Sequence, residues 1–278
     1  MATGHAADRA PLWRGDSSGG FVVRLARDEA DLLAAQRLRY RVFVQGMGSD
    51  GPLVDHARRL ERDAFDPHLD HLLLIDTTRD PRDGDHVVGA YRLLPDTRLA
   101  QLGRFYCDSE FDLAPLIGSG KRLLELGRTC IDPACRGGIG MMQMWQGLAE
   151  YVLRNDIDIL FGAASFPGTD PAVFAQALAC LHHCHLAPAP LRVRATQENG
   201  YTPLPRAQLD RKAAMLQMPT LIRSYLRLGG MIGEGIFIDH DFRTTDICII
   251  LDRAGLSAQA RSLARRVPPP GPDHDLDL

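Results

Sequence analysis

Carboxylate and guanidinium side chains that could move a proton or hold a charged substrate gather in two stretches of this 278-residue chain. The first, Glu61-Arg-Asp63-Ala-Phe65-Asp66, places three carboxylates within six residues. Such crowding is costly unless the charges are solvated or paired with cations. We therefore expect either a solvated acidic loop or a segment that faces arginines or a cationic substrate.

The second stretch, Glu125-Leu-Gly127-Arg128, lies in a predicted strand, residues 122–131. Glu125 and Arg128 are three residues apart, so a regular pleat would send them to opposite faces. Gly127 lies between them, and a glycine inside a strand often marks a bulge, whose extra residue would return both side chains to one face. A bulge would also separate this strand from the next and free backbone N–H groups for a ligand. The alternative is a regular strand with an internal salt bridge or an edge charge pair.

A glycine-rich turn follows this strand and leads into a predicted helix, about 140–154, and a second strand, 157–161. The apolar residues of the helix recur at helical spacing and form one stripe. The N-terminus of a helix attracts phosphate, because its backbone N–H groups are unpaired. The residues that could bind the phosphate of a pyrophosphate or phosphopantetheine group are Arg136, Gly137, Gly138 and Gly140. A plain turn between strand and helix is the alternative.

A helix is also predicted near the N-terminus, from a cap at Asp28 to about Phe43. Arg37 and Arg41 share one face of this helix, and Arg39 stacks over Phe43 on another, since each pair is four residues apart.

Two strands, 71–76 and 86–94, follow and should pair as a hairpin. In the second strand, alternation places Arg92 on the same face as Val88, Ala90 and Leu94. An arginine in such an apolar row is costly unless it meets an anion.

The remaining pattern predicts an α+β (mixed α/β) fold with one central sheet. The further elements are a strand at 21–26, a short helix at 109–118, a helix at 171–184, an extended stretch at 191–195, a helix at 216–228 with Pro219 in its first turn, and strands at 231–238 and 246–251. Residues 21–255 form the single domain. Residues 1–20 are predicted to be a disordered tail, and 256–278 a C-terminal tail that is disordered toward its end.

Composition narrows the class of protein. The net charge of -3 argues against bulk nucleic-acid binding. The chain has no apolar run of about 18 residues and no apolar secretory signal, so we expect a cytoplasmic protein. The six cysteines show no disulfide framework. The Cys180–His185 run resembles a metal-ligand run but lacks a second ligand pair, so we expect buried thiols at a helix end and no metal.

Together these residues resemble the acyltransferases of the Gcn5-related N-acyltransferase superfamily. One similar group is the acyl-homoserine-lactone synthases, whose motifs look like Arg39 with Phe43, Asp63 with Asp66, Glu125 with Arg128, and a strand arginine at Arg92. The tryptophan that this group carries shortly after the phenylalanine is missing here, where GMGSDG stands instead.

A second group, the ornithine N-acyltransferases, resembles nearly the whole chain from Phe21 to Leu251. The shared stretches include LRYRVF, ERDAFDPHLDHLLLID, ELGRTCIDPACRGG, HLAP and YLRLGGMIGEGIFIDHDFRTTDICIIL. This resemblance implies a Gcn5-related N-acyltransferase-like domain with a mostly antiparallel sheet flanked by helices. It also implies transfer of a 3-hydroxyacyl chain from acyl carrier protein to the α-amine of L-ornithine, which gives a lyso-ornithine lipid. No resident cofactor is needed, because 4'-phosphopantetheine arrives on the carrier protein.

The roles that follow can be assigned residue by residue. The α-ammonium must lose a proton before it attacks a thioester, and Glu125 is the first choice of base, with Glu61 or Asp66 the second. Arg128 or Arg92 would hold the substrate carboxylate. The remaining acids of the loop, such as Asp63, would hold the δ-ammonium, and N–H groups of the bulged strand would meet the oxyanion.

Arg39 and Phe43 belong to the substrate-binding set implied by the resemblance. Carrier protein is acidic, so Arg37 and Arg41, with Arg39, are candidates for its docking surface, and Arg136 for its phosphopantetheine phosphate.

Other functions remain open at this level. A lactone synthase would use S-adenosylmethionine as acceptor, and an ordinary transferase would take acetyl-CoA. A non-enzymatic alternative is a module that binds a lipid or an acyl carrier. The amphiphilic product also raises the question of contact with a membrane surface.

Overall fold

In a computed structural model, the described residues are 13–14, 20–52, 54–135 and 139–256. They form a nine-stranded sheet in the order β1-β2-β3-β4-β6-β7-β11-β10, with β9 also paired to β11. All neighbouring strands are antiparallel except β6 and β7, which are parallel. The strands are β1 (Trp13–Arg14), β2 (Phe21–Leu25), β3 (Asp70–Asp76), β4 (Val87–Pro95), β6 (Leu123–Ile131), β7 (Ile159–Pro167), β9 (Met231–Ile232), β10 (Phe237–Asp239) and β11 (Thr244–Asp252). The predicted α+β fold with a mostly antiparallel sheet is confirmed.

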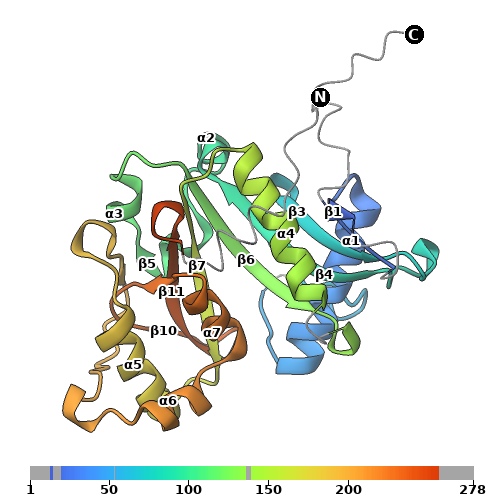
Figure 1. The fold of residues 1–278 in the computed structure, drawn as a ribbon. Coiled ribbons are helices and arrows are strands. Elements are labelled where there is room, and N and C mark those ends of the chain that lie inside the picture. The colour runs from blue at the N-terminus through green and yellow to red at the C-terminus, as the bar shows by residue number, and fades with distance from the viewer. Residues whose placement is uncertain (1–12, 15–19, 53, 136–138, 257–278) are drawn as a thin grey trace.

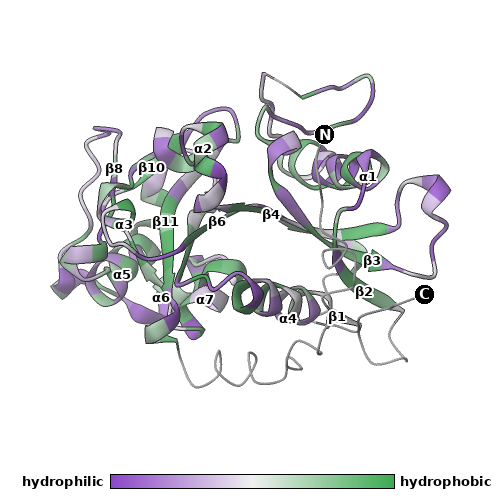
Figure 2. Cartoon of the chain, turned by 90° about the horizontal axis from the view of Figure 1, so that it is seen from above, coloured by the Kyte–Doolittle hydropathy of each residue, from purple (hydrophilic) through white to green (hydrophobic). Residues whose placement is uncertain are grey.

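Helices cover both faces of this sheet (Figure 1). They are α1 (Glu29–Arg39), α2 (Leu99–Leu102), α3 (Ala114–Ile117), α4 (Ile139–Arg154), α5 (Ala175–His185), α6 (Arg211–Gln217) and α7 (Thr220–Arg227); a small two-stranded sheet pairs β5 (Phe111–Asp112) with β8 (Arg194–Ala195). Figure 2 shows α1 on one face of the large sheet and α4 and α7 on the opposite face. We call these the α1 face and the α4 face.

The core follows the same division. On the α4 face, α4 and α7 pack on the central strands through one large apolar cluster that includes Leu72, Leu124, Met144 and Ile222. On the α1 face, α1 covers β3 and β4 through a small cluster that includes Leu38 and Leu73. A separate cluster, containing Phe105, Phe161 and Ile250, lies under the segment that leads to α3. The charged site lies on the α1 face.

The first helix begins as predicted. The Asp28 side chain caps it by accepting a hydrogen bond from Asp31 N at 2.9 Å. The helix continues past Arg39 as a π-helical segment, Tyr40–Gln45. The predicted helix from Asp28 to about Phe43 is therefore confirmed, with a change of helical type at its end.

The β6–α4–β7 crossover was also predicted, and it matters for the site. Parallel pairing of β6 with β7 runs only from Leu123↔Ile159 to Glu125↔Phe161. Beyond that point each strand keeps its antiparallel partner on the other side, β4 for β6 and β11 for β7. The two central strands thus separate just after Glu125.

Other expectations need correction. The β3–β4 hairpin is confirmed, but its register shifts at Leu74/Ile75. Val88 joins the cluster on the α4 face, whereas Ala90 packs against α1, so these two residues do not share a face as predicted. The predicted strand at 231–238 is two short strands, β9 and β10. The predicted helix at 216–228 is divided: residues 216–217 are the end of α6, and α7 begins directly after Pro219, which lies at its N-cap position.

The predicted tails fall mostly outside the described residues. Within the predicted N-terminal tail, Trp13–Arg14 form β1 and pair with Val22 and Val23 of β2, so this part is ordered. Among the described residues, none of the helices combines the length and apolarity needed to cross a bilayer.

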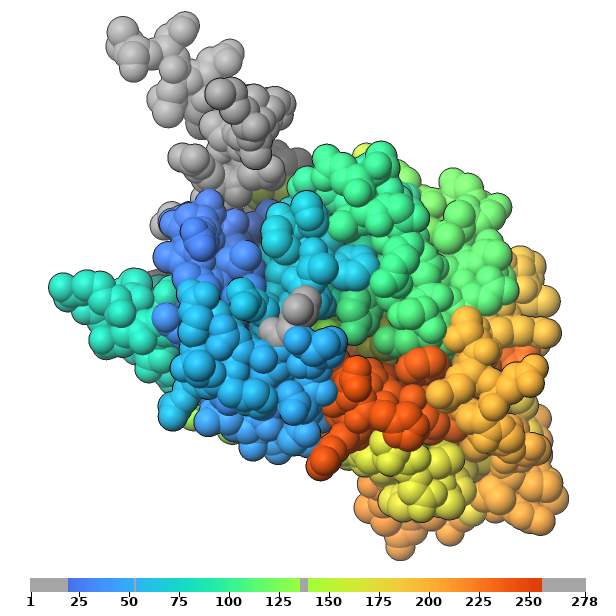
Figure 3. Space-filling view, turned by 180° about the vertical axis from the view of Figure 1, so that it is seen from behind, coloured from blue at the N-terminus to red at the C-terminus, as the bar shows by residue number. Residues whose placement is uncertain are grey.

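Segments distant in sequence meet over the α1 face. Figure 3 shows the blue and cyan N-terminal part of the chain beside the green segment near residue 110 and the orange-red segment near residue 240. Backbone hydrogen bonds support this arrangement, since Asp50 N donates to Asp241 O at 2.9 Å.

Candidate active site

A bulge in β6 brings the predicted chemical residues to one face. Arg92 of β4 pairs with Gly127 and Ala90 pairs with Cys130, so Tyr91 alone faces two residues of β6. One of these two, Arg128, adopts φ +50, a left-handed conformation that is rare for a residue with a side chain. The predicted bulge is confirmed, and it directs both Glu125 and Arg128 toward Tyr106.

The acidic loop is paired with arginines rather than solvated. Arg39 is 1% exposed and forms ion pairs with Glu61 and Asp66, each with a shortest distance of 2.5 Å. Its second bond to Asp66 is 2.8 Å long, so the pair is two-pronged. Of the alternatives for this loop, the one in which acids face the arginines of the first helix is confirmed.

Two strand arginines complete this charge network. Arg92 bonds to Asp63 and lies 3.2 Å from Asp66, as expected of an arginine that needs an anion in an apolar row. Arg128 Nε donates to Glu61 at 3.0 Å, and Arg128 Nη2 lies 3.5 Å from Asp63. We call these residues the charge network; its members are Arg39, Arg92, Arg128, Glu61, Asp63 and Asp66. Three positive and three negative groups balance within it.

The network keeps Asp66 and Asp63 ionised. Burial disfavours the charge on Asp66, but Arg39 outweighs it by charge and hydrogen bonding and, with Arg92, holds the pKa of Asp66 well below its usual range. Burial likewise opposes the charge on Asp63, and Arg92 and Arg128 lower the pKa of that carboxyl overall. Carboxylates with lowered pKa are weak bases, so neither is well suited to accept a proton from an ammonium.

Glu125 is held by the backbone. Its two carboxylate oxygens accept hydrogen bonds from Tyr106 N at 2.7 Å and Cys107 N at 2.8 Å. Burial raises the pKa of Glu125, while these hydrogen bonds act in the opposite direction. With both oxygens occupied, Glu125 is suited to positioning the short helical turn Tyr106–Ser109 over the site.

Arg128 is enclosed by aromatic rings. Its guanidinium carbon lies 4.8 Å from the Tyr106 ring centroid and 4.3 Å from that of Phe242, in the turn between β10 and β11. The Tyr106 hydroxyl accepts from Arg128 Nη2 at 3.1 Å. The Arg128 side chain is 12% exposed, against 1% for Arg39 and 3% for Arg92. Of the network's arginines, Arg128 is therefore the most open to a substrate carboxylate.

A second acidic group beside Arg128 was missed by the sequence analysis. Oxygens of Glu110, Asp239 and Asp246 all lie within 4.8 Å of one another. We call this set the acidic cluster. Asp246 is a charged residue inside the apolar strand TTDICIILD, and the reasoning applied to Arg92 could have singled it out. No local pattern marks Glu110 or Asp239.

The predicted phosphate-binding turn is only partly described. Arg136, Gly137 and Gly138 lie outside the described residues. Gly140 is in the first turn of α4, where a Cβ would come within 3.1 Å of Leu74 Cδ2. Close packing of α4 on the sheet therefore explains this glycine.

The remaining residues of the first helix separate into two groups. Arg37 is exposed and lies over Gly84 in the β3–β4 turn, whereas Arg41 is half-buried and 3.5 Å from Asp132 at the end of β6. Phe43 is half-buried against the cluster under α1. The prediction that Arg39 contributes to a docking surface is wrong, because ion pairing with Glu61 and Asp66 buries it.

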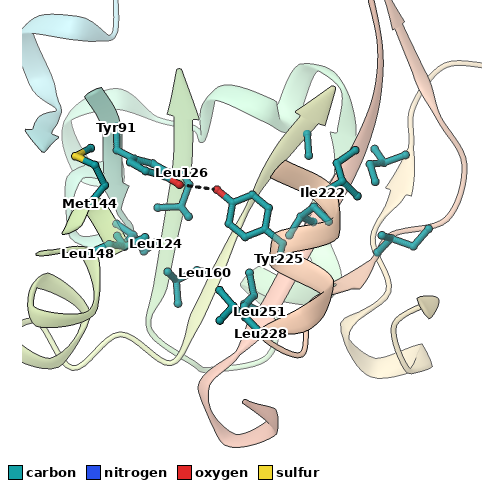
Figure 4. Packing of buried hydrophobic residues seen from close by; sticks show 14 of the residues in the cluster. Tyr91, Leu124, Leu126, Met144, Leu148, Leu160, Ile222, Tyr225, Leu228 and Leu251 are labelled. Carbon is teal, nitrogen blue, oxygen red and sulfur yellow. Dashed lines mark hydrogen bonds between the residues drawn. The ribbon is translucent and has the colours of Figure 1, made fainter. Parts of the chain in front are cut away.

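The α4 face carries a polar group at the point where β6 and β7 separate. The hydroxyls of Tyr91 and Tyr225 are 3.1 Å apart, and Trp145 Nε1 donates to the Tyr91 hydroxyl at 3.1 Å. Figure 4 shows Tyr225 reaching from α7 across Leu126 to Tyr91, among leucines of β6, β7 and β11. Burial raises the pKa of both tyrosines, so both hydroxyls carry protons.

Comparison with known proteins identifies the family. Residues 38–146 match the family described as an acetyltransferase (GNAT) domain. The chain is 54% identical to an L-ornithine N(alpha)-acyltransferase of Rhodobacter capsulatus over 88% of this chain and 95% of that protein. The chain belongs to the L-ornithine N(alpha)-acyltransferase family. A second member, from Agrobacterium fabrum, is 40% identical over 87% of this chain and 84% of its own length.

Solved structures agree with this family at the level of the fold. FeeM, an N-acyl amino acid synthase from uncultured soil microbes, matches with a TM-score of 0.51 and 14% identity, covering 90% of this chain and 96% of FeeM. BjaI, a CoA-dependent acyl-homoserine lactone synthase, matches with a TM-score of 0.50 and 15% identity, covering 89% of this chain and 90% of BjaI. This member of the L-ornithine N(alpha)-acyltransferase family thus has the expected acyltransferase fold.

Proposed function

We propose that this protein transfers a 3-hydroxyacyl chain from acyl carrier protein to the α-amine of L-ornithine and so forms a lyso-ornithine lipid. The observation that carries the proposal is the 54% identity with the R. capsulatus L-ornithine N(alpha)-acyltransferase across 88% of the chain. The geometry supports it, because the charge network and the acidic cluster offer both signs of charge to a zwitterionic acceptor beside the gap between β6 and β7.

The acceptor carboxylate is assigned to Arg128. Its guanidinium is held in place by Glu61, Tyr106 and Phe242, so little side-chain freedom is lost when a substrate binds. Arg92 supports this position, and its Nη2 is a buried donor that has no hydrogen-bond partner within the described part of the chain. Arg39 contributes indirectly, by fixing Glu61 and Asp66.

The thioester is assigned to the gap between β6 and β7. Beyond Glu125↔Phe161 the β6 backbone has no ladder partner on the β7 side, so its N–H groups can bind the oxyanion. Each such donor is worth about 3 kcal/mol in well-studied enzymes. On the α4 face of the gap, one of the two hydroxyls of Tyr91 and Tyr225 donates to the other. The remaining hydroxyl proton can form a hydrogen bond to the departing thiolate, which takes up the proton that the attacking amine releases. No covalent acyl-enzyme is needed, so the cysteines take no part.

Attack requires the neutral α-amine. Glu125 was the first choice of base from the sequence, and its two backbone hydrogen bonds favour a positioning role instead. Glu61 and Asp66 are ion-paired with Arg39. We therefore propose that the α-ammonium loses its proton to solvent, while Glu125 positions Tyr106 beside Arg128.

Carrier protein is proposed as the donor, with 4'-phosphopantetheine as its arm and no cofactor resident in the enzyme. Arg37, exposed, and Arg41, partly exposed, remain the proposed docking residues for this acidic partner. The start of α4 would face the phosphate.

Peripheral contact with the membrane is a further part of the proposal. Val173 is 58% exposed, Met215 44% and Leu216 79%, and the exposed Arg211 and Lys212 lie on the same short helix as Met215 and Leu216. Gln176 N bonds to Gln217 Oε1 at 3.0 Å, which ties α5 to the end of α6. Apolar side chains beside basic ones suit the surface of an anionic bilayer.

A competition assay tests the function. Purified protein is incubated with 3-hydroxyacyl carrier protein and an equimolar pool of the protein amino acids, ornithine and S-adenosylmethionine, and products are identified by mass spectrometry. Acyl-ornithine should dominate. Homoserine lactones would support a synthase of the other group, and equal turnover with acetyl-CoA would point to an ordinary acetyltransferase.

A further inference from the structure

The acidic cluster brings together three carboxyl groups for which the described residues supply no paired cation. Glu110, from the segment before β5, is 5% exposed, and Asp246 of β11 is 4% exposed. Asp239 of β10 is half-buried. Among the ion pairs of the described residues, none joins an arginine or lysine to any of these three carboxylates. Burial and the neighbouring carboxylates raise the pKa of Glu110 to about 8 and that of Asp246 to about 6, so a cation is needed to keep all three groups ionised at neutral pH.

Two oxygens of the cluster are left without partners. Glu110 Oε2 and Asp246 Oδ1 are buried and accept no hydrogen bond from any of the described residues. The neighbouring oxygens do accept: Asp246 Oδ2 from the Thr244 hydroxyl at 3.2 Å, and Asp239 Oδ1 from Phe242 N at 2.8 Å. A buried acceptor without a donor is costly, so these two oxygens indicate a ligand that brings N–H groups.

The nearest cation is already engaged. Arg128 bonds to Glu61 and Tyr106 and packs on Phe242, and its charge only partly offsets the repulsion felt by Glu110 and Asp246. A cation that keeps the acidic cluster ionised must therefore come from outside the described residues.

We propose that Glu110, Asp239 and Asp246 bind the side-chain ammonium of a diamino-acid acceptor. The inference rests on the proposed function, which supplies the acceptor. An ammonium group has three N–H donors, enough to reach three carboxylates. Because Phe242 contacts Arg128 and its N–H bonds to Asp239, the acidic cluster lies next to the residue assigned to the acceptor carboxylate. The two ends of one molecule can be held at once, with the α-amine at the Arg128 end, on the carbon that bears the carboxylate.

Access to the acidic cluster is open at one edge. In the sheet, Asp246 of β11 lies opposite Ser165 of β7, and Ser165 is exposed. Asp239 is only half-buried. A side-chain ammonium can thus enter from solvent past Ser165 and Asp239 and reach the deeper Glu110.

This arrangement makes the acidic cluster a determinant of acceptor specificity. A site whose buried polar groups require a donor rejects an analogue that lacks it, because those groups are then left unpaired. Norvaline has the carbon chain of ornithine without the side-chain amine. The wild-type enzyme should therefore prefer ornithine to norvaline strongly, by about 100-fold or more in kcat/KM.

The test compares the ornithine-to-norvaline ratio of kcat/KM in the full-length wild type, Glu110→Gln and Asp246→Asn. Each substitution should lower the ratio at least about 10-fold, since one charged partner is lost. Glu150→Gln is the matched control, because Glu150 is a buried carboxylate that lies on the α4 face and pairs with Arg154. The ornithine-to-norvaline ratio of this variant should equal that of the wild type. Thermal unfolding of each variant checks the fold, and ornithine-induced stabilisation without donor gives a second readout.

The outcomes separate this inference from the proposed function. If the wild type acylates ornithine but both variants keep its preference, the acidic cluster does not bind the ammonium. If the wild type acylates no ornithine, the proposed function itself fails. Titration with Mg²⁺ or Ca²⁺ adds a third arm: stabilisation by the metal alone that disappears in Glu110→Gln, with loss of activity in a chelator, would assign the cluster to a metal and overturn the inference.

Discussion

Arg39 and Asp66, 27 residues apart in the chain, form a two-pronged ion pair with bonds of 2.8 and 2.5 Å. Both are almost fully buried, at 1% and 2% exposure. The pair fixes the end of α1 to the segment before β3, and Asp66 extends the contact to Arg92 of β4. The floor of the candidate active site is thus held by charges that are satisfied only in the folded state.

Breaking this pair should destabilise the protein. In Asp66→Asn, Arg39 keeps its buried charge with weaker compensation, and the loss in unfolding free energy should be about 3 to 5 kcal/mol. Urea unfolding at neutral pH measures it. Asp80→Asn removes an exposed ion pair with Arg82 and should leave stability nearly unchanged. Equal stability of the two variants would mean that the buried pair contributes little.

The pair of Arg39 and Asp66 should also make the stability of the fold depend on pH. The pKa of Asp66 is lower in the folded protein than in the unfolded chain. Its ionisation therefore contributes stability above the unfolded pKa, near 4, and this contribution is lost as the pH falls below that value. Wild type should lose stability between about pH 4 and pH 2 more steeply than Asp66→Asn. If the unfolding free energies of the wild type and Asp66→Asn fall in parallel as the pH is lowered, another group governs acid unfolding.

Arg128→Lys should damage acceptor binding more than folding. Lysine keeps the charge but cannot hold Glu61, Tyr106 and a substrate carboxylate with a planar fork. We expect the KM for ornithine to rise about 10-fold or more, with a smaller change in kcat. Arg98→Lys is the control, since the Arg98 side chain is 41% exposed and forms only a 3.4 Å ion pair with half-buried Asp70, outside the charge network. An unchanged KM would remove Arg128 from the acceptor site.

Glu125→Gln separates a positioning role from a base. An amide has one oxygen, so it can no longer accept from both Tyr106 N and Cys107 N through two oxygens. If Glu125 positions this turn, kcat/KM should fall while the pH dependence of the remaining activity keeps its shape. Loss of the acid limb, the fall in wild-type activity at low pH, would instead identify Glu125 as the proton acceptor.

Docking of the carrier protein should depend on salt. Arg37→Glu and Arg41→Glu should each weaken carrier-protein affinity, and added salt should weaken the wild-type complex. Arg227→Glu, exposed at the end of α7, is the control. If carrier-protein affinity changes with neither salt nor these charge reversals, the docking surface lies elsewhere.

Much of this site could be predicted from the sequence, because the patterns that mark its residues lie within short stretches of the chain. Gly127 between Glu125 and Arg128 marked the bulge, and an arginine in an apolar strand at Arg92 required an anion. The acid-rich loop predicted cationic partners, and Arg39 proved to be one of them. These arguments need only strand periodicity and the cost of buried charge.

The rest depended on contacts across the fold. Glu110 and Asp246 are separated by more than a hundred residues and meet because β11 pairs with β7 beside the segment that precedes β5. Gly233 and Gly235 divide the predicted strand at 231–238 into β9 and β10, because the chain turns there toward β8. The register shift that moves Val88 to the α4 face likewise has no local signal.

The most direct test of the account is the position of the acyl group on the product. Wild-type enzyme with 3-hydroxyacyl carrier protein and ornithine should give a single acyl-ornithine, and tandem mass spectrometry should place the acyl chain on the α-nitrogen with the δ-amine free. An acyl chain on the δ-nitrogen, or no acyl-ornithine at all, would contradict it.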